Sequence, residues 1–150
     1  MIEIKNLYKS FGTHQAVDNL SLEIHQGEIF GFLGKNGAGK STTLRCLLTL
    51  IHPDSGSILF KGKDVYQNRN YFLQNVGAII EKPDFYGNMS GLQNLKISAT
   101  YYEAKTGQKR INEILELVGL AGREKDKVKT YSQGMKQRLG IAQPIIHDPA

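Results

Sequence analysis

The chain has 150 residues, of which 40% are apolar and 22% are charged, and these values are typical of a globular domain. No apolar run approaches the roughly 18 residues that a membrane-spanning helix needs, and the N-terminus lacks the apolar stretch of a signal peptide. The single cysteine, Cys46, excludes a disulfide framework and agrees with a reducing compartment. The four histidines are far apart in sequence and predict no metal site. We therefore expect one cytoplasmic domain, or most of one.

The first 33 residues predict strands. Apolar and polar residues alternate over residues 2–7 and again over 17–24, as they do in half-buried strands. A turn at Gln26 and Gly27 then leads into the apolar run 28–33. These segments predict an antiparallel patch that continues into a parallel sheet.

Residues 34–42, which we call the phosphate loop, match Gly-x-x-x-x-Gly-Lys-Ser/Thr without deviation. Crowded phosphates need many donors at close range, so Gly34, Gly37 and Gly39 are predicted to take positive φ and turn backbone N–H groups inward. Lys40 is expected near the terminal phosphates and Ser41 in the coordination shell of Mg²⁺. The alternative is a glycine-rich turn with an unrelated lysine. The predicted phosphate-binding residues are Gly34, Asn36, Gly37, Ala38, Gly39, Lys40, Ser41 and Thr42.

A helix is predicted to begin at about Gly39, and its positive dipole end adds to the same anion site. Its apolar stripe runs from Leu44 to Ile51 and includes Cys46, which we expect to be buried. Residues 53–56 end this helix. Strand-like runs follow at 57–60 and 76–80, and the second is apolar throughout, as in a buried parallel strand.

From about residue 89 the pattern is helical. Ser90 and Gln93 form a capping box at the start of one helix, a second helix is predicted around 111–118, and Ser132 caps a third. Pro144 is expected to bend that third helix. We therefore expect a core over about residues 1–88, which carries the phosphate loop, and a helical subdomain over about 89–147.

The net charge is +5, and the stretch from Arg123 to Arg138 contains six basic residues and two acidic ones. Nucleic-acid binding is one interpretation, but no aromatic residues alternate with the charges to form a stacking platform. A solvated helix face is the other interpretation, and we favour it. No nucleic-acid partner is therefore expected.

Residues 131–138, Tyr-Ser-Gln-Gly-Met-Lys-Gln-Arg, resemble the Leu-Ser-Gly-Gly-Gln signature of ABC proteins at Ser132 and Gly134. We call them the signature segment. Together with the phosphate loop, they make the whole chain resemble the nucleotide-binding domain of an ABC transporter, as do residues 53–58 and 90–95. The resemblance implies an α/β P-loop NTPase fold that is incomplete at the C-terminus, with ATP and Mg²⁺ as cofactors.

The resemblance also implies roles for residues outside the phosphate loop. Phe11 takes the position whose ring stacks on adenine, although packing at a strand edge is the alternative. Ser132 and Gly134 would bind the ATP of an opposing subunit in a head-to-tail dimer, although a plain helix cap also explains Ser132. Transmembrane permease subunits are then expected as partners, with the chain peripheral on the inner face of the membrane.

Three departures from the family pattern carry further expectations. Glu81 replaces the usual glutamine and is predicted to bind Mg²⁺ or the attacking water. Glu81 and Lys40 are therefore the predicted catalytic residues. Gln133 and Met135 in the signature segment resemble the subgroup that exports bacitracin, lantibiotics and related drugs. The sequence ends before the strand with the magnesium-binding Asp and general-base Glu, so we expect no hydrolysis from these residues alone.

The predicted function is an ABC-type ATPase subunit that couples ATP binding and hydrolysis to export through separate membrane subunits. One alternative is a nucleotide-binding module without turnover. A soluble ABC ATPase that acts on DNA or ribosomes is another, although no long coiled-coil insertion or second cassette is present in the sequence. A small GTPase is disfavoured because the sequence has no Asn-Lys-x-Asp motif.

Overall fold

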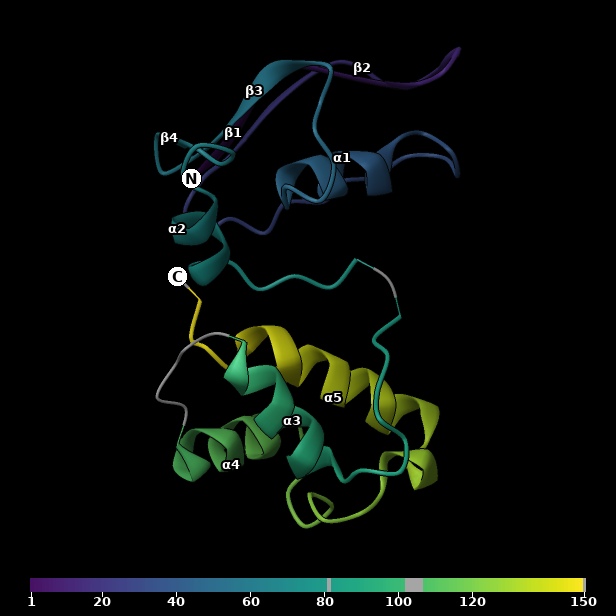
Figure 1. Cartoon of the computed structure of the whole chain (residues 1–150), viewed down its shortest axis with the longest axis vertical. Coiled ribbons are helices and arrows are strands. Elements are labelled where there is room, and N and C mark those ends of the chain that lie inside the picture. The colour runs from purple at the N-terminus through teal and green to yellow at the C-terminus, as the bar shows by residue number, and fades with distance from the viewer. Residues whose placement is uncertain (81, 102–106, 150) are drawn as a thin grey trace. The chain divides into compact units, whose positions relative to one another are not determined.

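The computed structural model describes residues 1–80, 82–101 and 107–149. The chain divides into two compact units, Met1–Leu73 and Gln74–Ala150. Figure 1 labels the elements of both. Each unit has its own buried core, so each is described by itself.

The first unit contains a four-stranded sheet with the order β2-β1-β3-β4. Every pair is antiparallel, which confirms the predicted antiparallel patch. Ile4 of β1 and its partner Ile58 of β3 are buried on the same face of the sheet. Leu7 is buried as well, although it lies three residues after Ile4, and the pairing of β1 with β2 shifts register between these two residues. The strands are β1 (Ile2–Phe11), β2 (His14–Ile24), β3 (Ser55–Phe60) and β4 (Lys63–Asp64).

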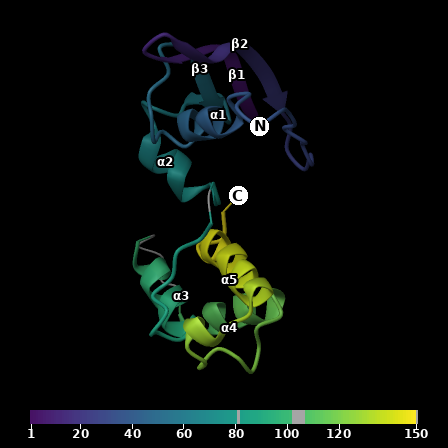
Figure 2. The same cartoon turned by 90° about the vertical axis from the view of Figure 1, so that its right-hand side faces the viewer.

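Helix α1 (Lys40–Leu47) lies along the sheet in both views (Figures 1 and 2), and Cys46 on it is fully buried, as predicted. The helix ends before Ile51, although the apolar stripe continues to that residue. Thr49 has φ 57°, a left-handed conformation that cannot continue a right-handed helix. A short helix, α2 (Arg69–Gln74), buries Phe72 and completes this unit.

The two predicted parallel strands do not form. Residues 28–33 and 76–80 have no strand assignment, and Ile29 and Leu33 are 100% and 91% exposed. A strand exists only when a neighbouring chain pairs with its N–H and C=O groups, and no strand of the described residues does so here. The apolar composition of the two runs was therefore insufficient to predict strands within these residues.

The described residues of the second unit form the helices α3 (Gly91–Thr100), α4 (Gln108–Leu117) and α5 (Gln133–Ile145) (Figure 2). They also form a 3₁₀ turn, η1 (Val128–Thr130). The capping box predicted at Ser90 and Gln93 is present, with both hydrogen bonds formed. Leu95, Ile114 and Leu139 contribute one fully buried residue from each helix to a common core. Among the described residues, no helix has the combination of length and apolar character that a membrane crossing requires.

The second unit begins at Gln74, whereas the change of sequence pattern lies near residue 89. The intervening segment packs closely on α5. A Cβ on Gly77 would collide with the carbonyl of Pro144, and a Cβ on Gly140 would collide with the ring of Pro83. These close backbone contacts join the segment to the helices although it has no helical pattern of its own.

Candidate nucleotide-binding site

The phosphate loop leads directly into α1. Gly37 and Gly39 have φ 84° and 81°, in the left-handed region that glycine adopts without strain. A Cβ on Gly39 would also collide with the carbonyl oxygen of Ala16 on β2, so the close approach of loop and strand requires glycine. The prediction of positive φ is wrong for Gly34, which does not have a left-handed conformation. Its carbonyl accepts a hydrogen bond from Lys40.

The ammonium of Lys40 is folded back over the loop. Its Nζ atom donates hydrogen bonds of 2.7 Å to the carbonyl oxygens of both Gly34 and Lys35. These two bonds hold a positive charge at the start of α1, whose first turn contains no acidic residue. Thr43 is the first residue whose N–H bonds back to a helix carbonyl, that of Gly39, so the N–H groups before it have no intrahelical acceptor. Charge, dipole and free donors thus coincide at one point, as an anion site needs.

A cleft of about 360 Å³ opens beside the loop. Phe11, at the end of β1, lies on its wall, although it is more than 20 residues from the loop in sequence. Its ring is 52% exposed, and Lys9 Nζ lies 5.4 Å from the ring centroid. The cleft is lined by Phe11, His14, Ala16, Asn36, Gly37, Gly39, Lys40, Ser41 and Thr42.

Two lining residues, His14 and Ala16, were not predicted from the sequence. His14 pairs with Phe11 across the hairpin, and Ala16 follows two residues later on the same face of β2. The alternation of side chains in β2 could have predicted that His14 and Ala16 share a face. Only the pairing of β2 with β1 shows that this face lies beside the phosphate loop. Conversely, Ala38 was predicted to bind phosphate, but it lines a neighbouring pocket with Thr43 rather than this cleft.

The predicted magnesium ligands are only partly described. Ser41 is exposed on the cleft wall, so its hydroxyl is open to a metal ion that accompanies phosphates. Glu81, predicted as the second ligand and a catalytic residue, lies outside the described residues. Within the described ranges, no group of three or more His, Cys, Asp or Glu side chains is placed to hold a metal ion by itself. A single hydroxyl ligand such as Ser41 fits Mg²⁺ that is bound together with nucleotide phosphates.

The signature segment forms the start of α5 in the second unit. Ser132 is the N-cap, and its Oγ accepts a hydrogen bond of 3.3 Å from the N–H of Met135. Ser132, Gln133 and Gly134 are all exposed, and nothing lies within 4 Å of a Cβ built on Gly134. The plain helix cap is thus observed, and the anion site remains a prediction.

Tyr131, the residue before the N-cap of α5, anchors the start of this helix in the core of the second unit. It is 4% exposed, and its hydroxyl donates a hydrogen bond of 2.7 Å to the carbonyl of Arg123. Burial raises the pKa of this hydroxyl. Gly91 of α3 makes room for it, because a Cβ there would collide with the phenol oxygen. An aromatic residue before the cap was the only sign of this anchor in the sequence.

The basic stretch 123–138 is mostly engaged locally or solvated. Arg123 forms an ion pair of 2.7 Å with Asp126, and Arg138 donates to the carbonyl of Gly119. Lys127 and Lys129 are exposed. This arrangement agrees with a solvated surface, but the prediction of a helix face is wrong for residues 123–132, because α5 begins only at Gln133.

Comparison with known proteins places these features in one family. The family model described as "ABC transporter" matches residues 17–150. The chain is 44% identical to the bacitracin transport ATP-binding protein BcrA of Bacillus licheniformis, over 99% of this chain and 48% of that protein. It is 40% identical to the lantibiotic transport ATP-binding protein SrtF of Streptococcus pyogenes, over 99% of this chain and 63% of that protein. The chain thus spans about half the length of BcrA.

The fold agrees with this relationship. A solved structure titled as the ATP-binding subunit of an ABC transporter superposes with a TM-score of 0.85 over 99% of this chain and 63% of that structure, at 24% identity. This likeness confirms the predicted P-loop NTPase fold class, with its antiparallel N-terminal sheet and helices. The chain belongs to the ABC transporter family.

Proposed function

We propose that this chain is the ATP-binding part of an ABC transporter subunit that couples ATP binding and hydrolysis to export. The single observation that carries the proposal is the cleft that joins the half-exposed ring of Phe11 to the phosphate loop and Lys40. One end of this cleft offers a stacking surface for a base and the other offers positive charge with backbone donors. A nucleoside triphosphate has the same two-ended chemistry.

The residues of the cleft divide the work of binding. The N–H groups of the loop and of the first turn of α1 donate to phosphate oxygens. Lys40 exchanges its bonds to the carbonyls of Gly34 and Lys35 for bonds to phosphate, so no new charge has to be brought to the site. Ser41 and Glu81 would hold Mg²⁺, and the ion would supply positive charge beside the phosphates. Phe11 stacks on adenine.

Ser132 and Gly134 contribute to a second nucleotide site. Ser132 Oγ accepts one hydrogen bond from the N–H of Met135, and its O–H is still available as a donor. Gly134 leaves the helix start open to approach. We propose that this surface binds the phosphate of ATP held by a second ATP-binding subunit, in a head-to-tail dimer. Membrane permease subunits are the further partners, with the chain on the cytoplasmic face of the membrane.

The proposed cargo class is a peptide antibiotic or a related drug. Support comes from the names of the relatives, which describe transport of bacitracin and of a lantibiotic, at 44% and 40% identity. Gln133 and Met135 of the signature segment agree with that subgroup. Hydrolysis is proposed for the whole protein, and the 150 residues alone are expected to bind without turnover.

Calorimetric titration of the chain with MgATP tests the proposal, with MgGTP as competitor. We expect saturable ATP binding that GTP displaces weakly and that Lys40→Ala weakens. An absence of binding at millimolar MgATP would contradict the proposal, and preference for GTP would favour a GTPase. Turnover at the rate of complete transporter subunits would show that the catalytic groups are wrongly assigned.

A further inference from the structure

The orientation of the Phe11 ring depends on how the end of β1 is held. The ring lies at the end of β1 beside the turn at Gly12, and half of its surface is exposed. The ladder between β1 and β2 is irregular at three points between Ile4 and Ser10. A stacking surface at such a position has a fixed orientation only if something else fixes the end of the strand.

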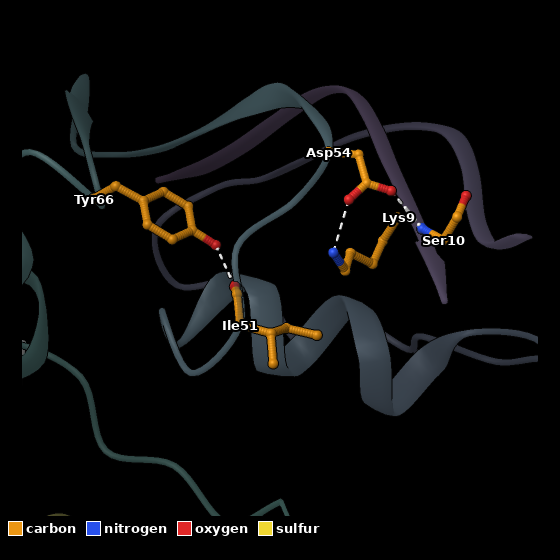
Figure 3. A network of polar contacts seen from close by, with 5 residues as sticks. All are labelled: Lys9, Ser10, Ile51, Asp54 and Tyr66. Carbon is orange, nitrogen blue, oxygen red and sulfur yellow. Dashed lines mark hydrogen bonds and ion pairs between the residues drawn. The ribbon is translucent and has the colours of Figure 1, made fainter. Parts of the chain in front are cut away.

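Asp54 supplies that support from a segment 44 residues away from Ser10 (Figure 3). Its carboxylate accepts a hydrogen bond of 2.6 Å from the N–H of Ser10 and one of 2.7 Å from Nζ of Lys9. Its own N–H donates to the carbonyl of Tyr8 at 2.8 Å. One residue therefore holds three consecutive residues of β1.

The carboxylate of Asp54 extends the sheet beyond its last backbone pair. Tyr8 pairs with Ser55 at the end of the β1–β3 ladder, and Ser10 lies beyond that point. The side chain then stands where a strand carbonyl would otherwise accept the N–H of Ser10. The hydrogen bonds that hold β1 therefore extend to Ser10, the residue immediately before Phe11.

Lys9 connects this support to the ring itself. Its ammonium is paired with Asp54 and lies over the ring of Phe11, 5.4 Å from the centroid. The lysine side chain is only 17% exposed, so the charge is held close to the protein rather than extended into solvent. A cation over one face of an aromatic ring is attracted to it, and the opposite face remains available for a base.

The segment that carries Asp54 is fixed in turn. The hydroxyl oxygen of Tyr66 lies 2.7 Å from the carbonyl oxygen of Cys46 in α1 and 2.8 Å from that of Ile51 just after this helix, so its single hydrogen is shared between the two acceptors. Figure 3 shows the bond to Ile51. Because α1 begins at the phosphate loop, the same helix leads from the phosphate end of the cleft to the support of its base end.

We propose that Asp54 and Lys9 are positioning residues for the nucleobase, which fix the end of β1 so that Phe11 presents a constant ring face to adenine. This inference rests on the proposed function. It predicts that the pair contributes to affinity only when the ligand carries a base. Inorganic tripolyphosphate, which has the phosphates alone, is therefore the discriminating probe.

The test compares the dissociation constants of MgATP and magnesium tripolyphosphate for the whole chain and for Asp54→Ala and the milder Asp54→Asn. Complete loss of base stacking corresponds to roughly a 5- to 150-fold loss of affinity, and we expect a part of it, about 3- to 10-fold for ATP, from Asp54→Ala. Tripolyphosphate affinity is expected to change by less than about twofold, because phosphate contacts are untouched. Lys9→Met is expected to act in the same way as Asp54→Ala, and Lys9→Arg to restore the ratio.

Asp126→Ala is the matched control. It removes an ion pair of the same length, 2.7 Å, from a carboxylate that is 42% exposed, against 46% for Asp54. Its ratio of the two dissociation constants should equal that of the unmodified chain. The sequence has no tryptophan, so Phe11→Trp adds a single reporter whose fluorescence ATP should quench less when Asp54 is also replaced.

An unchanged ratio in both Asp54 variants overturns the inference, even if they unfold at lower temperature, because a purely structural role lowers stability without distinguishing the ligands. Equal quenching with and without Asp54 overturns it as well. If the unmodified chain binds tripolyphosphate and ATP equally, stacking by Phe11 fails and the inference fails with it. If the unmodified chain binds neither ligand, the proposed function itself fails, so the two failures are distinguishable.

Discussion

The phosphate loop and the signature segment both open a helix with glycine and serine, yet the structure builds them differently. At the phosphate loop, two left-handed glycines, a folded-back lysine and a neighbouring strand enclose a cleft. At the signature segment, Ser132 caps α5 and the following residues are exposed, with open space around Gly134. The first motif lines a cleft within this chain, whereas the second is an open surface on which we propose that a partner subunit docks.

The largest expected difference concerns the glycines of the two motifs. Gly39→Ala should lower the free energy of unfolding of the first unit by about 3–5 kcal/mol, because φ is positive there and the new Cβ collides with a backbone carbonyl. Gly134→Ala should be neutral or stabilise by up to about 1 kcal/mol, since it lies in a helix with free space. Urea denaturation of both variants measures the contrast, and equal effects would contradict it.

The next prediction concerns charge at the phosphate loop. Lys40→Ala should weaken MgATP binding by roughly 10- to 100-fold, because charge-assisted hydrogen bonds to phosphate are lost. Lys35→Ala is the matched control, since this neighbouring lysine is exposed and only its carbonyl contacts Lys40. Isothermal titration separates the two. Similar losses in both variants would show that general attraction, rather than the placement of Lys40, binds the nucleotide.

A smaller effect is expected at the signature segment. Ser132→Ala should destabilise α5 by about 1 kcal/mol, because the N–H of Met135 loses its acceptor. The affinity of the monomeric Ser132→Ala variant for ATP should stay unchanged, in contrast to that of Lys40→Ala. Hydrogen exchange of α5 and a parallel ATP titration measure both quantities. A weaker ATP affinity in the monomer would disprove the distinction between a complete site and an open surface.

The smallest expected effect is the loss of stability at low pH through Asp54, which lies near the nucleobase end of the cleft. The signature segment has no corresponding carboxylate. Hydrogen bonds from Lys9 and from the N–H of Ser10 hold the pKa of Asp54 below its ordinary value of 3.8. A pKa that folding lowers gives stability above the unfolded pKa, and this stability is lost as pH falls through the folded pKa. The chain should therefore lose slightly more unfolding free energy than Asp54→Asn between pH 5 and pH 3, measured by urea denaturation. An identical pH dependence would contradict the ion pair.

Local chemistry made some features predictable from sequence. The caps at Ser90 and Ser132 and the left-handed Gly37 and Gly39 follow from interactions within a few residues, and all four are present. The predictions of parallel strands were wrong because a strand depends on pairing with another segment, and no strand of the described residues pairs with residues 28–33 or 76–80. The unpredicted parts of the cleft, His14 and the support of Phe11 by Asp54, likewise arise from pairing between distant segments.

Phe11 illustrates the limit most clearly. Its sequence neighbours predict only a strand end, and its stacking role came from the family resemblance rather than from any local pattern. The structure brings its ring to the cleft through the β1–β2 hairpin and the contact of Gly39 with Ala16. Tertiary contacts of this kind leave no periodic signal in a single sequence.

Titration of the ¹⁵N-labelled chain with MgATP, followed by amide NMR, tests the central claim most directly. The account predicts that the amides of Gly37, Gly39, Lys40 and Phe11 shift together with one dissociation constant, while those of Ser132 to Met135 stay unchanged as long as the chain is monomeric. Loop amides that remain unshifted at millimolar MgATP, or signature amides that shift in the monomer with the same constant, would contradict it.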